Sequence, residues 1–272
     1  MRLGVSTYSY WRFRGPKLPL AEYLTMAYED GFSGVEVLVN HFESRARSYI
    51  REVRRLAFEL GLDVYAVAIH NNFVKPDPQE RGRQVEYVKE WLEVAHELGA
   101  GVVRINSGRW GTVKSFDELM ARKGMEPPIE GYTEEDAIEW VVDCIHQCLD
   151  KAEDLGVVLG LENHWGLTTR AETMLRIVKR ISSRWFGVVM DTGNFVYDTY
   201  RELEMIAPYA VMVHAKTYFG GGIWYTLDLD YGRIFSILKR VGFRGWISLE
   251  YEGLEEVRSG VRKSRELLSK YV

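Results

Sequence analysis

The chain has 272 residues, 46% of them hydrophobic, which suffices for one large core or two small ones. Its 35 Lys and Arg against 39 Asp and Glu give a formal charge of −4, so no excess positive charge is available for a nucleic-acid backbone. No apolar run approaches the roughly 18 residues of a membrane span, and the start lacks the apolar centre of a secretion signal. These features predict a cytoplasmic protein that binds neither nucleic acid nor a membrane.

Short β-rich runs alternate with segments of helical period, and the alternation repeats eight times. Most of the β-rich runs are continuously apolar, as expected for strands that are covered on both faces. The predicted strands span residues 2–6, 34–39, 63–69, 102–105, 157–161, 186–190, 210–213 and 246–249. The predicted helices span residues 18–30, 44–60, 78–98, 133–155, 169–181, 199–207, 231–241 and 254–270.

Eight such units without a break in composition predict one α/β domain over residues 1–272, folded as a (β/α)8 barrel. A doubly wound sheet would usually carry a glycine-rich phosphate turn after its first strand, and GVSTYSYW is not one. Residues 106–132 form a long connection and are predicted to be a partly helical lid. Residues 217–230 contain three consecutive glycines, for which a flexible turn is the favoured interpretation over a phosphate site.

The two cysteines, Cys144 and Cys148, lie four residues apart and share one face of a predicted helix. His146 points away from that face. Buried free thiols are therefore expected, rather than a redox or metal site.

The asparagines and most histidines cluster at the ends of predicted strands. All six asparagines and four of the six histidines lie at or within about four residues of the C-terminal end of a strand, and in a (β/α)8 barrel these ends form the active-site face. They are Asn40, Asn71, Asn72, Asn106, Asn163 and Asn194, with His41, His70, His164 and His214. The pattern predicts an active site on this face.

Four strand-end residues have the chemistry of a metal site: Glu162, Asp191, His214 and Glu250. They follow four successive strands, and period-two alternation points each of them into the barrel. Three carboxylates and one imidazole suit Mn²⁺, Mg²⁺, Co²⁺ or Zn²⁺ with open positions for a substrate. Without a cation, three inward carboxylates would repel one another. The alternative is a set of polar strand ends that bond only to backbone or water.

The motifs GLENHWG, VVMDTGNF, VHAKTY and YGRIFSILKRVGFRGWISLEYEG, with the earlier GFSGVEVLV, resemble the xylose-isomerase-like TIM-barrel superfamily. That group includes ketose 3-epimerases, hydroxypyruvate isomerase, inosose isomerases and dehydratases, and endonuclease IV. The resemblance implies that Glu162, Asp191, His214 and Glu250 bind one divalent ion, usually manganese. It also implies that Glu162 and Glu250 act as acid and base, and that a homodimer or homotetramer is a common assembly.

Chelation of a carbonyl and a neighbouring hydroxyl acidifies the C–H bond between them and stabilises an enediolate. Two carboxylates on opposite faces of that carbon allow epimerisation, and proton return to the adjacent carbon gives isomerisation. The sequence predicts a metal-dependent isomerase or epimerase of a keto-sugar or keto-cyclitol. A lyase or dehydratase is the closest alternative, followed by a glycoside hydrolase, a phosphodiesterase and a non-catalytic sugar-binding barrel.

Some positions depart from the patterns that the resemblance implies. Ketose 3-epimerases usually carry His, Glu and Arg at the positions held here by Asn194, Thr168 and Gly220, which argues against ordinary free-ketohexose epimerisation. Endonuclease IV-like members use several more histidines to hold three zinc ions. Here Asn106 and Asn194 stand at strand ends, and His70 alone cannot complete such a cluster.

Further residues are predicted to contact the substrate: His70, His164, Lys216, Glu36, Asn106, Asn194, Trp11 and Trp165. Lys216 could polarise a substrate oxygen. Glu36 is a charge within an apolar strand, so we expect it to bond a metal ligand or the substrate. Four tryptophans lie in predicted loops, and we expect two of them to touch the substrate: Trp11, Trp110, Trp165 and Trp224.

Overall fold

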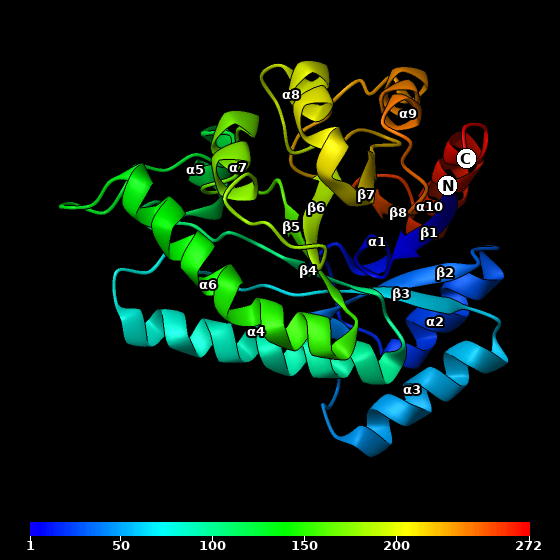
Figure 1. Cartoon of the computed structure of the whole chain (residues 1–272). Helices are drawn as coiled ribbons and strands as arrows, with labels where there is room; N and C mark the ends of the chain where they lie inside the picture. Colours follow the sequence, from blue (N-terminus) through cyan, green and yellow to red (C-terminus); the bar gives the residue numbers. More distant parts are fainter.

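The computed structural model describes residues 1–272 and contains eight parallel strands that close into a barrel (Figure 1). The strands are β1 (Arg2–Ser6), β2 (Gly34–Leu38), β3 (Asp63–Ala68), β4 (Val102–Ile105), β5 (Val158–Glu162), β6 (Phe186–Asp191), β7 (Ala210–Thr217) and β8 (Trp246–Tyr251). They pair in chain order, and β1 pairs with β8 to close the sheet. The predicted (β/α)8 barrel is confirmed, and every predicted strand overlaps an observed one, although β7 continues four residues beyond its predicted end.

Helices cover the outside of the barrel. They are α2 (Leu20–Glu29), α3 (Arg47–Glu59), α4 (Pro78–Leu98), α6 (Glu134–Leu155), α7 (Ala171–Val178), α8 (Thr199–Ile206), α9 (Tyr231–Arg240) and α10 (Val257–Ser269). The two longest, α4 and α6, pack side by side (Figure 1). Every predicted helix is present, with small differences at its ends. None of the helices combines the length and the apolar character that a membrane crossing requires.

The start and end of α6 show how local sequence sets a helix boundary. Thr133 and Asp136 form a capping box, in which each side chain accepts a hydrogen bond from the backbone N–H of the other residue. At the other end Gly156 has a φ of +67°, a left-handed conformation that glycine adopts at low cost. Cys144 and Cys148 are both free and buried on this helix, as expected.

Short elements lie in the connections. They are α1 (Tyr8–Trp11), α5 (Phe116–Ala121) and the 3-10 helices η1 (Val39–His41) and η2 (Ala207–Tyr209). The helix α5 gives the long connection 106–132 its predicted helical part. This connection packs on the barrel rim, where the backbone N–H of Gly166 donates to the carbonyl of Gly124 at 2.9 Å.

The inside of the barrel is filled below its rim. The rings of Tyr65 and Trp246 stack with centroids 4.4 Å apart and belong to a small apolar cluster separate from the main core. A Cβ atom at Gly160 would lie 2.6 Å from Val189, so only glycine fits there. The packed interior leaves the polar strand ends above it as the place for a site.

Candidate metal centre

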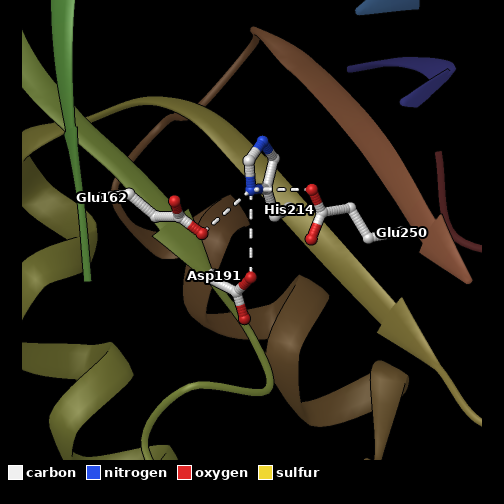
Figure 2. A group of neighbouring side chains, drawn as sticks. All are labelled: Glu162, Asp191, His214 and Glu250. Atoms are coloured by element: carbon white, nitrogen blue, oxygen red, sulfur yellow. Dashed lines mark hydrogen bonds and ion pairs between the residues drawn. The ribbon is translucent and has the colours of Figure 1, made fainter. Parts of the chain in front are cut away.

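The structure brings together the side chains of Glu162, Asp191, His214 and Glu250 (Figure 2). All four are buried, and one donor atom of each lies within 4.8 Å of the others. They stand on β5, β6, β7 and β8, and the strand register places Asp191 directly beside His214. Adjacent parallel strands end at one edge, which is why residues so far apart in sequence meet here.

The ring of His214 lies between the carboxylates. Its Nδ1 is 3.3 Å from Glu162 Oε1, 3.5 Å from Glu250 Oε1 and 3.8 Å from Asp191 Oδ2 (Figure 2). On the other side of the ring, Nε2 donates to Oε1 of the fully buried Glu36 at 2.9 Å. An ionised carboxylate only accepts hydrogen bonds, so Nε2 carries a proton. Burial would lower the pKa of His214, but Glu250 and Glu36 hold it well above its ordinary value, so Nδ1 is protonated as well in the metal-free protein. A cation held among the carboxylates would replace the proton on Nδ1 and face its lone pair.

Negative charge exceeds positive charge around this point. Five carboxylates are buried here, from Glu36, Glu162, Asp191, Glu250 and Glu252, and Lys216 and Arg104 are the permanently charged cations among them. Burial raises the pKa of Asp191 to about 8; Lys216 opposes this rise, and Glu162 and Glu250 add to it. An additional cation would relieve this repulsion.

Two carboxylate oxygens are poorly satisfied by the protein. Glu162 Oε2 and Asp191 Oδ2 are buried and accept no hydrogen bond. Each has only a charged neighbour, Arg104 Nε at 3.3 Å and Lys216 Nζ at 3.0 Å, respectively. Buried oxygens normally accept hydrogen bonds, so these two atoms, which accept none, and the O₃N donor set fit a divalent cation.

Lys216 lies deeper in the site than a simple surface lysine would. Its Nζ is 3.0 Å from both Asp191 Oδ2 and Glu252 Oε1, and it also donates to Glu250 Oε2. Burial would lower the pKa of Lys216, but Asp191, Glu250 and Glu252 hold it well above its ordinary value. Lys216 is therefore an ammonium group that links two of the candidate ligands to Glu252.

A cavity of about 370 Å³ opens above the cluster, and Glu162 and Glu250 form part of its wall. Five of the predicted substrate contacts line it: His70, His164, Lys216, Asn194 and Trp165. Trp224 lines it as well, so two of the four loop tryptophans reach the cavity. Burial lowers the pKa of His70 to about 3 and that of His164 to about 4, so both imidazoles are neutral near pH 7.

Three predicted substrate contacts do not line this cavity. Glu36 is fully buried, and its carboxylate accepts a hydrogen bond from His214. The side-chain oxygen of Asn106 accepts a hydrogen bond from Arg104 at 3.0 Å, so this amide organises the end of β4. Trp11 packs against Phe13, with ring centroids 4.5 Å apart, and Trp110 likewise packs on another tryptophan ring.

Other cavity residues were not predicted, and they include Arg104, Glu252, Tyr8, Phe13 and Phe116. Arg104 interrupts the apolar run VVRI, which is the same kind of signal that identified Glu36. Glu252 continues the period-two alternation that contains Glu250. The aromatic residues had no comparable signal, because their place depends on how the loops fold.

Comparisons with known proteins agree with this architecture. A family model described as xylose isomerase-like TIM barrel matches residues 24–271. An uncharacterized protein of Methanocaldococcus jannaschii is 24% identical over 260 residues, which cover 90% of this chain and 82% of that protein.

Solved structures share the fold at low identity. D-psicose 3-epimerase from Clostridium cellulolyticum H10, solved with D-tagatose, is 14% identical with a TM-score of 0.78 and coverage of 100% of this chain and 99% of that one. The IOLI protein with a bound zinc atom is 17% identical with a TM-score of 0.74 and the same coverage. Since the family model spans nearly the whole barrel, the chain belongs to the xylose isomerase-like TIM-barrel family.

Proposed function

We propose that this protein is a divalent-metal-dependent sugar isomerase or epimerase. The observation that carries the proposal is the buried set of three carboxylates and one imidazole beneath a cavity. Two similar folds give it support, because one is a sugar epimerase solved with a ketose and the other holds zinc. A keto-sugar or keto-cyclitol is the proposed substrate.

The ion would be held by Glu162, Asp191, His214 and Glu250. The proposed metal is Mn²⁺, and the same donor atoms are compatible with Co²⁺, Mg²⁺ or Zn²⁺. When bound, a divalent ion supplies a Lewis acid that acidifies the C–H bond beside a substrate carbonyl. The remaining chemistry belongs to the side chains that face the cavity.

Glu162 and Glu250 are the proposed acid and base. They approach Nδ1 of His214 from opposite sides (Figure 2). Both also line the cavity. Burial alone would raise their pKa values. Arg104 opposes this rise most strongly at Glu162, and His214 does so at Glu250. The pKa of each carboxyl group is therefore held below its usual value.

Each side chain is therefore a carboxylate, which can take a proton from a substrate carbon that is bound between the two. Return of a proton by the opposite carboxylate inverts that carbon, and return to the neighbouring carbon converts an aldose to a ketose or the reverse.

The test follows proton exchange. Protein reconstituted with Mn²⁺ is incubated with keto-sugars and inososes in D2O, and deuterium incorporation is followed by NMR. We expect exchange at the carbon next to the carbonyl, and its loss in both Glu162→Gln and Glu250→Gln. Glu202→Gln is a matched control, because Glu202 is also buried but pairs with Arg170 away from the cavity.

Several outcomes would contradict the proposal. If the protein retains no metal after reconstitution, the proposed metal site is wrong. If Glu250→Gln shows full exchange, the proposed role of two carboxylates is wrong. A dehydrated or fragmented product would indicate a lyase. Hydrolysis of a glycoside that persists after chelation would indicate a glycoside hydrolase.

A further inference from the structure

One wall of the cavity is made of three aromatic rings from three different connections between strands and helices. Phe116 belongs to α5, Trp165 follows β5 and Trp224 follows β7. The ring centroid of Phe116 is 5.0 Å from that of Trp165 and 4.7 Å from that of Trp224. These three residues form what we call the aromatic wall.

The charged groups of the cavity are engaged with one another, whereas the imidazoles of His70 and His164 face it as neutral polar groups for the sugar ring. Lys216 pairs with Glu250 and Glu252, and Tyr8 donates to Glu252 at 3.0 Å. The aromatic wall adds carbon surface, with the two indole N–H groups as its only polar atoms. The buried Nε1 of Trp165 has no hydrogen-bond partner and can donate to one substrate oxygen. A hydroxyl placed against the carbon faces of the rings would lose hydrogen bonds to water without regaining them, whereas an apolar group would gain by being buried.

The charges around the cavity also restrict the substrate. Arg104 is already paired with Glu162, with 3.3 Å between Nε and Oε2, and Lys216 is paired with acidic side chains. Even with a divalent ion bound, the five buried carboxylates described above leave no excess of positive charge. A phosphate would therefore find no free cation, although phosphate sites normally provide one.

We propose that the cavity selects a neutral keto-sugar that carries an apolar substituent, such as an aryl group, and that this substituent lies against the aromatic wall. The inference rests on the proposed function and names the substrate class of the same site. The volume of about 370 Å³ is within the range of roughly 300–1,000 Å³ that holds small organic ligands.

The test compares matched substrates that differ only at the substituent. The methyl glycoside of a 3-keto-hexose, its phenyl analogue and the 6-phosphate of the methyl glycoside are offered to the Mn²⁺-reconstituted protein. We expect kcat/KM for deuterium exchange to be about tenfold higher for the phenyl than for the methyl glycoside, and lowest for the phosphate.

Phe116→Ala should reduce the preference for the phenyl group to about threefold or less. Phe116 is 37% exposed, so its removal leaves the core intact. Phe58→Ala is the control, because Phe58 is 84% exposed on α3, outside the cavity. Quenching of tryptophan fluorescence by phenyl glucoside, which has no ketone, measures binding without turnover.

The results separate this inference from the proposed function. Three results would overturn the inference and leave the isomerase function standing. They are exchange at equal rates with all three substrates, a preference for the phosphate, and a phenyl preference that Phe116→Ala does not reduce. Quenching by phenyl glucoside that Phe116→Ala weakens, without exchange on any substrate, would support the aromatic wall and overturn the proposed function.

Discussion

Glu36 accepts a hydrogen bond from Nε2 of His214 at 2.9 Å, although the two residues stand on β2 and β7, which are not neighbours in the barrel. The other oxygen of Glu36 accepts from Ser248 Oγ at 2.9 Å, and Ser248 accepts from Tyr65 at 2.7 Å. This chain of hydrogen bonds fixes the imidazole from below. It leaves Nδ1 facing the carboxylates above, which is the orientation that a metal ligand requires.

Replacing Glu36 with Gln should weaken metal binding by about 10–100-fold, the usual effect of losing a carboxylate behind a histidine ligand. An amide can still accept from His214, but its NH₂ group then faces Ser248, whose hydroxyl must reverse its own hydrogen bonds. Titration calorimetry with Mn²⁺ measures the change against the buried control Glu202→Gln. Unchanged affinity would show that Glu36 does not position His214.

Replacing Lys216 with Met should destabilise the metal-free protein, because Asp191, Glu250 and Glu252 would lose their shared cation. Removing one partner of a buried ion pair costs roughly 3–5 kcal/mol, a fall in Tm of about 5–15 °C. Mn²⁺ should raise the Tm of this variant by more than it raises the wild-type Tm.

The control for that comparison is Lys151→Met. Lys151 pairs with Glu93 at the surface, where an ion pair contributes roughly 1 kcal/mol or less. Equal Tm values for Lys216→Met and wild type without metal would show that the carboxylates do not depend on Lys216.

The barrel could be predicted because each of its signals is local. Apolar runs of strand length alternate eight times with segments of helical period, and the observed elements follow them. The end of β7 was predicted too early, at residue 213. The apolar run ends there because the following residues include the polar His214, Lys216 and Thr217. The strand nevertheless continues to residue 217, since its inward-facing polar residues belong to the site. The four residues of α1 are too few to show a helical period.

The candidate site was predictable only where strand spacing determines it. Glu162, Asp191, His214 and Glu250 end successive strands, so alternation and topology bring them together. The hydrogen-bond partner of Glu36 depends on the length and direction of side chains that cross the barrel. The spacing of residues along the sequence does not determine these. Asn106 showed the same strand-end signal as a ligand, but its side-chain oxygen accepts a hydrogen bond from Arg104 and it does not line the cavity, because a polar side chain can bond a neighbouring protein group as well as a substrate.

Glu126 organises the connection 106–132, and its loss should loosen this segment. The buried carboxylate accepts from the backbone N–H of Gly111 at 2.6 Å, from that of Val113 at 3.2 Å and from Arg109 Nη1 at 3.1 Å. Glu126→Ala leaves these donors unpaired, at a cost of roughly 1–3 kcal/mol.

Trypsin should then cleave within 106–132 faster than in the wild-type protein, as mapped by mass spectrometry. The exposed Glu130→Ala is the control and should leave the rate unchanged. Equal rates in Glu126→Ala and wild type would mean that the segment is held by its other contacts.

The thiols of Cys144 and Cys148 should be unreactive in the native protein. Burial raises the pKa of each to about 12, from an ordinary value near 9. Below pH 9 both the folded and the unfolded chain hold these protons. Between pH 9 and pH 12 the unfolded chain loses them first, so the stability that the neutral thiols contribute is lost as the pH rises through that interval.

At pH 8 a disulfide reagent such as DTNB should therefore label neither thiol in the native protein and both in denaturant. Labelling of the native protein as fast as that of the denatured protein would contradict the buried placement on α6.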